Sequence, residues 1–168
     1  MLRKIVFILV GMALLGLGAV GGALATPSRD VSAETARGPL VDRPLDVSME
    51  FENGAKAEVE LKTKGPIEIA NQRIVAAPGA TFGWHTHPGP TIVTVLSGTL
   101  SFYHAEHCTE EIEYDAGDSF SNLPHEIHLA RNETTQTVVI YASYFVPART
   151  PPVALRIDQP SPGAGCPQ

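Results

Sequence analysis

Short runs in which apolar and polar residues alternate, separated by turn residues, dominate the chain after its first 46 positions. Alternation with a period of two is typical of β-strands that bury one face. Ser97-Gly98 and residues 115–118 provide tight turns between neighbouring runs. Many short strands joined by turns predict an all-β sandwich or barrel, which we place at residues 47–146. The runs with strand character are residues 57–63, 67–75, 91–96, 99–103, 111–114, 119–120, 126–131 and 137–145.

The first 25 residues follow a different pattern. Arg3 and Lys4 precede a continuous apolar stretch, and Ala23-Leu24-Ala25 ends it with the small residues that signal peptidases accept. We interpret residues 1–25 as a secretory signal peptide cleaved after Ala25. An uncleaved membrane anchor is the alternative, because the apolar stretch is about long enough to span a bilayer. Either way we expect the domain to be secreted or extracytoplasmic, in the periplasm or cell envelope.

Proline-rich segments flank the predicted domain. Residues 26–46 are polar and proline-broken, which predicts a flexible linker. Residues 147–168 are proline-rich and should lie extended over the surface without pairing in the sheet. In an oxidising compartment Cys108 and Cys166 would form a disulfide that ties this tail back to the body. Two free thiols are the alternative.

Histidine supplies the candidate chemistry. His85 and His87 are two residues apart on a predicted strand, so both imidazoles point to the same face. His128 lies on a later strand. Should that strand lie across the barrel from the first, three neutral nitrogens would converge on one point. Imidazole is a good ligand for Fe, Zn, Cu or Ni.

The residues around the histidine pair resemble the first motif of the cupin superfamily. That motif is a glycine, five residues, H-x-H, three or four residues, usually a glutamate, six residues and a glycine. Gly79, His85, His87 and Gly98 fit this spacing, and Thr91 stands at the glutamate position.

The second cupin motif is matched around His128. Gly117, Pro124 and Asn132 stand at its glycine, turn proline and asparagine positions, although His125 replaces the glycine of the turn. The resemblance covers about residues 74–145. It implies a single jelly-roll-like β-barrel with any metal held by His85, His87 and His128.

The threonine at position 91 changes the expected chemistry. A hydroxyl is a poor ligand for a divalent transition ion, so the site would hold Fe, Mn, Ni, Zn or Cu with histidines alone. Thiol dioxygenases are similar in using three histidines, so oxygen chemistry on Fe(II) is compatible. Loss of the metal is the alternative. Glu126, two residues before His128, would restore a carboxylate or act as a general base on a regular strand. On an irregular turn it would be solvated.

Inward alternation predicts Thr91, Val93, Phe102 and Tyr141 as residues that line the pocket. Three functions remain open: a metal-dependent oxidoreductase or isomerase, dioxygenase-like, acting on a small organic molecule; a non-catalytic module that binds a metal or small ligand; and a metal-free structural cupin. The resemblance also implies a homodimer. The net charge of -6, with no Lys/Arg run after Lys4, argues against a nucleic-acid partner.

Overall fold

The computed structural model describes residues 25–40, 45–50, 56–61 and 63–168. The predicted signal peptide therefore lies outside the described residues, apart from Ala25. Within the described ranges, no helix has the length and apolar character needed to cross a membrane.

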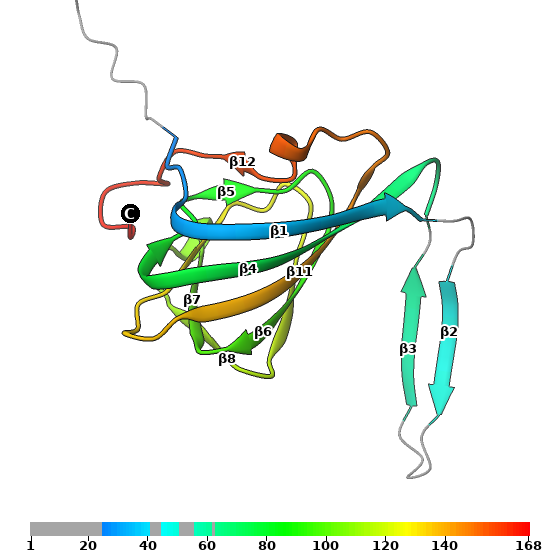
Figure 1. The fold of residues 1–168 in the computed structure, drawn as a ribbon, viewed down its shortest axis with the longest axis horizontal. Helices are drawn as coiled ribbons and strands as arrows, with labels where there is room; N and C mark the ends of the chain where they lie inside the picture. The colour runs from blue at the N-terminus through cyan, green and yellow to red at the C-terminus, as the bar shows by residue number, and fades with distance from the viewer. Residues whose placement is uncertain (1–24, 41–44, 51–55, 62) are drawn as a thin grey trace, which may run out of the picture.

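Strands make up nearly all the regular structure of these ranges (Figure 1). The main sheet has ten strands in the order β12-β5-β10-β4-β11-β6-β9, with β1 paired to β4 and β7 paired to both β10 and β8. The sheet curls into a nearly closed barrel, so the all-β prediction is confirmed and the barrel alternative is the correct one. Its strands are β1 (Arg29–Pro39), β4 (Ile67–Thr81), β5 (His85–Thr86), β6 (Thr91–Ser97), β7 (Thr99–His104), β8 (Ile112–Asp115), β9 (Ser119–Asn122), β10 (His128–Arg131), β11 (Val138–Pro147) and β12 (Ile157–Asp158).

The remaining elements lie outside this sheet. β2 (Leu45–Glu50) and β3 (Lys56–Leu61) pair with one another in a separate two-stranded antiparallel sheet. Two single-turn 3-10 helices, η1 (Ala105–His107) and η2 (Pro152–Ala154), follow β7 and β11.

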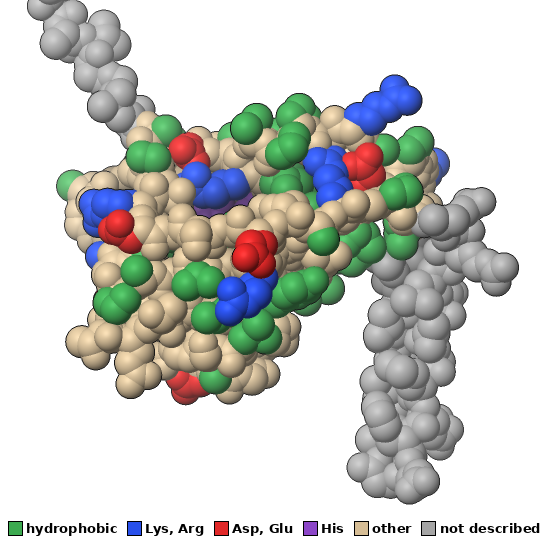
Figure 2. Space-filling view, in the orientation of Figure 1, with side chains coloured by type: hydrophobic (Ala, Val, Ile, Leu, Met, Phe, Trp, Pro, Cys, Tyr) green, Lys and Arg blue, Asp and Glu red, His purple; other side chains and the backbone are tan. Residues whose placement is uncertain are grey.

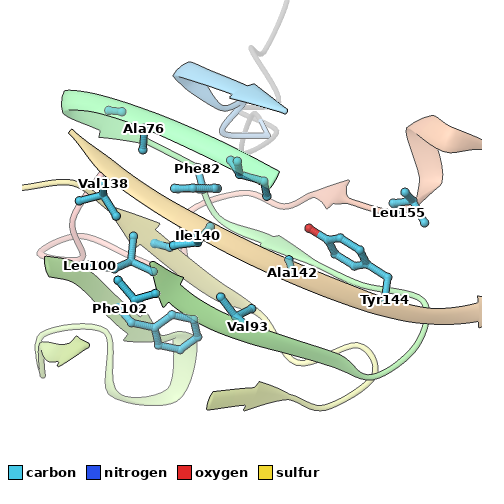
Figure 3. Close-up of a cluster of buried hydrophobic side chains, with 14 of the residues drawn as sticks. Ala76, Phe82, Val93, Leu100, Phe102, Val138, Ile140, Ala142, Tyr144 and Leu155 are labelled. Atoms are coloured by element: carbon cyan, nitrogen blue, oxygen red, sulfur yellow. The ribbon is translucent and has the colours of Figure 1, made fainter. Parts of the chain in front are cut away.

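The barrel is filled by every second residue of its strands. On β11 the residues Val138, Ile140, Ala142, Tyr144 and Val146 are buried, whereas those between them are partly or fully exposed (Figure 3). β6 shows the same alternation, because successive side chains point to opposite faces. β7 and β10 are buried on both faces, since Tyr103 and Leu129 belong to a second buried cluster. The other members of this core are Ala70, Ile74, Ala76, Ala80, Phe82, Val93, Val95, Leu100, Phe102, Ala130 and Leu155.

The segment expected to be a flexible linker contains a strand. Residues Arg29–Pro39 pair antiparallel with β4 along almost its entire length. Most of the strand's side chains are exposed, and only Val31 packs against the core. Its pairing satisfies backbone groups of β4 that would otherwise lie at an open edge. Because this strand is held by backbone hydrogen bonds and not by a buried apolar face, its sequence shows no alternation of apolar and polar residues.

The tail returns to the barrel and does more than lie on its surface. Ile157 and Asp158 pair with β5, which corrects the expectation of an unpaired tail. The expected disulfide joins Cys108 and Cys166. Both cysteines pack against a second buried cluster that contains Trp84, and the Trp84 Nε1–H donates to the Pro167 carbonyl at 2.8 Å.

Candidate metal centre

Two neighbouring strands bring the three predicted histidines together. His85 begins β5, His87 follows this strand, and His128 begins β10, where it is the pairing partner of His85. All three side chains are buried. One ring nitrogen from each lies within 4.8 Å of the others, and the ring centroids are 4.4 to 5.1 Å apart. The sequence-predicted triad is therefore a single cluster.

The same hydrogen-bond pattern orients each ring. Nδ1 of His85 donates to the Gly83 carbonyl at 2.8 Å, and Nδ1 of His87 donates to the Leu155 carbonyl at 2.7 Å. Nδ1 of His128 donates to the backbone carbonyl of Glu126 at 3.0 Å. A carbonyl only accepts, so each proton is fixed on Nδ1 and the lone pair on Nε2. Metal-binding histidines are held in this way by their outer partners.

Burial also keeps the three rings neutral. It lowers the pKa of His87 to about 4 and that of His128 to about 3. For His85, burial and then the neighbouring His128 and His87 lower the pKa well below its ordinary value. Neutral imidazoles are the form that binds a transition metal. The donor set, its tautomers and its spacing thus suit a metal ion.

The cluster faces a cavity of about 210 Å³ inside the barrel. Thr91, Val93 and Phe102 line this cavity as predicted. Thr91 is buried and its hydroxyl has no hydrogen-bond partner among the described residues, and the same is true of Oδ1 of its strand neighbour Asn122. Both oxygens belong to residues that line the cavity, so they are available to a ligand.

Tyr141, the fourth predicted lining residue, does not face the cavity. Its side chain is 42% exposed, and Tyr144 lines the cavity instead. Positions 141 and 144 have opposite parity on β11, so one of the two had to point outward. Val138 and Ile140 are buried, so the even-numbered residues of β11 face inward and Tyr144, not Tyr141, points into the barrel.

A model of the cupin domain family matches residues 72–147. Residues 72–147 are a cupin domain. Solved structures with a similar fold include an oxalate oxidase (21% identity, 48% of this chain and 46% of that chain, TM-score 0.41) and the cupin domain of an XRE family transcriptional regulator from Enterobacter cloacae (20%, 48% and 83%, TM-score 0.40). A third is the polyketide cyclase RemF from Streptomyces resistomycificus (10%, 75% and 77%, TM-score 0.45). The match spans less than half of the oxalate oxidase chain. Comparison with curated proteins found no match.

Within the cupin barrel, Glu126 takes the second of its two expected placements, on an irregular turn with its carboxylate away from the histidine cluster. Its carboxylate accepts a hydrogen bond from the Leu123 N–H at 2.8 Å and lies 2.6 Å from Nδ1 of His104. These groups line a separate outer cavity. The left-handed backbone of His125 (φ 63°) breaks the strand alternation just before Glu126. The turn therefore presents the Glu126 carbonyl, rather than its carboxylate, to His128.

Two elements of the cupin site come from the tail and were not predicted. Leu155 supplies the carbonyl that orients His87, and Arg156 lines the cavity. The Arg156 guanidinium pairs with Asp158 and donates to the Phe82 carbonyl. No motif marks these residues, and their role depends on how the tail folds back over the barrel.

Proposed function

We propose that this cupin binds one divalent transition-metal ion through Nε2 of His85, His87 and His128 and acts on a small organic molecule. The observation that carries this proposal is the set of three buried, neutral imidazoles, each fixed through Nδ1 by a backbone carbonyl. Without a ligand for their Nε2 atoms, three such rings would be costly polar groups in a barrel interior.

A bound ion would supply Lewis acidity or, as Fe(II), affinity for oxygen. Three neutral histidine ligands would not reduce the positive charge of the ion. Its remaining coordination positions would be open to other ligands. The surrounding walls of Val93, Phe102 and Phe120 exclude water and accept the apolar part of an organic molecule. Burial raises the pKa of Tyr144, so its hydroxyl stays protonated and is available as a hydrogen-bond donor at the cavity wall. This combination supports a dioxygenase-like oxidoreductase.

Binding without turnover is the second candidate. No aspartate, glutamate or lysine is among the described residues that line the cavity, so the walls offer no carboxylate or amine as a general base. Oxygen uptake by the Fe(II)-loaded protein with a panel of small thiols, alcohols and acids distinguishes the two. Uptake supports the enzyme, and metal binding without uptake supports the binding module.

Two observations support an extracytoplasmic location. The segment before Thr26 has the sequence of a secretory signal, and the Cys108–Cys166 disulfide is a bond that persists in oxidising compartments.

The metal site is tested by titrating the full chain with Zn²⁺. We expect one ion per chain, and we expect His128→Ala to weaken the affinity by more than about 100-fold, since loss of a ligand exceeds the 10- to 100-fold effect of losing an outer partner. Elemental analysis after dialysis and calorimetric titration measure both quantities.

The matched control is His107→Ala, which removes an exposed histidine from η1 and should leave the zinc affinity unchanged. A parent protein without stoichiometric zinc, or an His128→Ala variant that retains it, would contradict the proposal.

A further inference from the structure

The walls of the histidine cavity carry one formal charge. Among the described lining residues, Arg156 is the only arginine, and no lysine, aspartate or glutamate is present. Figure 2 shows basic surface directly beside histidine surface over β5, the strand that His85 begins. A bound divalent ion would add further positive charge. The cavity is thus electropositive, with nothing on its walls to balance the charge.

The guanidinium of Arg156 is held in place, but not all of its N–H groups have a hydrogen-bond partner. Asp158 pairs with Nη1, and Nη2 donates to the Phe82 carbonyl and, at 3.4 Å, to the Thr26 carbonyl. Nε is buried and has no partner within the described part of the chain. Asp158 does not line the cavity, and about a third of its side chain is exposed. Its charge is therefore shared with solvent, which leaves the Arg156 cation incompletely compensated on the cavity side.

Tyr144 and Arg156 line the same cavity. In Figure 3 the Tyr144 ring projects from β11 on the side of Leu155, the residue before Arg156. A guanidinium and a phenolic hydroxyl, both hydrogen-bond donors, match the oxygens of a carboxylate.

We propose that the cavity selects a small organic carboxylate, whose anionic end is held by Arg156 and Tyr144 and whose apolar part packs against Val93 and Phe120. The inference rests on the proposed function, because the metal ion and Arg156 would both attract the carboxylate. The cavity of about 210 Å³ sets the size, since a cavity of about 150 Å³ accommodates benzene. Acids up to a single aromatic ring therefore fit.

Calorimetric titration with acetate, 2-methylpropanoate and benzoate, each compared with its neutral amide, tests the proposal. The full chain is titrated both metal-free and loaded with Zn²⁺. At least one acid should bind more tightly than its amide by about 10-fold or more, because hydrogen bonds between charged groups are stronger than those to a neutral amide. Arg156→Gln should remove most of this preference in both forms.

Two further variants keep the test independent of folding defects. Arg37→Gln breaks a comparable pair, with Glu68, away from the cavity and should leave the preference unchanged. Asp158→Asn removes the competing carboxylate and should tighten acid binding several-fold. Thermal unfolding of each variant shows whether it folds, and Asp158→Asn still decides the question should Arg156→Gln fail to fold.

The outcomes separate this inference from the metal site. Acid selectivity in metal-free protein that takes up no zinc supports the Arg156 site and contradicts the proposed function. Stoichiometric zinc combined with no binding of any acid, equal binding of acids and amides, or a preference unchanged in both Arg156→Gln and Asp158→Asn overturns the carboxylate proposal alone.

Discussion

Replacing Cys108 and Cys166 with serine is expected to lower the free energy of unfolding by about 4 kcal/mol. The disulfide joins residues 58 positions apart, and release of a loop of that length gives the unfolded chain about this much conformational entropy. Both cysteines also pack against the cluster around Trp84. Urea unfolding followed by the fluorescence of Trp84, the single tryptophan of the chain, measures the change.

The same substitution should weaken zinc binding by about 10- to 100-fold, although neither cysteine touches the histidines. The disulfide anchors the tail, the tail supplies the Leu155 carbonyl that orients His87, and β12 pairs with β5 beside His85. Parent protein treated with a thiol reductant, which is then removed under anaerobic conditions, serves as the comparison. An unchanged denaturation midpoint and zinc affinity would show that the tail holds its position without the bond.

Lowering the pH from 7 to 5 is expected to destabilise the metal-free protein by about 4 kcal/mol through two histidines alone. The pKa is about 4 for His87 and about 3 for His128 in the folded protein, against an ordinary value of 6.5. Below pH 6.5 these two histidines therefore bind protons in the unfolded chain but remain neutral in the folded chain. Each histidine then costs about 1.4 kcal/mol per pH unit. The loss ends only when the pH passes below the folded values.

Urea unfolding of the metal-free protein at several pH values between 5 and 7 measures this effect. The double variant His87→Gln, His128→Gln lacks both groups and should lose about 4 kcal/mol less over the same range. Equal pH dependence of parent and double variant would mean that these rings accept protons readily in the folded state, contrary to their burial in the barrel.

The barrel and the histidine cluster could be predicted because both follow from local spacing. The two-residue period of β11 specifies a strand with one buried face, and the H-x-H pair puts His85 and His87 on one side of the chain. The motif spacing then identified His128 as the third histidine, although its strand is the neighbour of β5 and does not lie across the barrel from it. Each of these features depends on residues that are close in sequence or in a fixed pattern.

The features that could not be predicted depend on distant pairing. β1 is held mainly by backbone pairing with β4, so it can form from polar residues. The sequence of Arg29–Pro39 therefore contains no apolar pattern that would predict the pairing. The sequence left two placements open for Glu126, because the positive φ of His125, which decides between them, is not marked by a glycine. Arg156 reaches the cavity on a tail that pairs with β5 and is joined to the barrel by the Cys108–Cys166 bond, both of them long-range contacts. Sequence periodicity carries no information about such long-range contacts.

One wall of the cavity is made by residues outside the cupin domain itself. Arg156 lies beyond residue 147, where the family match ends, on a segment that contacts the barrel but is not one of its inward-facing core strands. Because the Leu155 backbone orients His87, replacing the whole segment would also disturb the histidine cluster. Substituting the Arg156 side chain alone changes the cavity wall while the backbone contact to His87 is kept, which offers a direct route to new specificity in engineered forms of this protein.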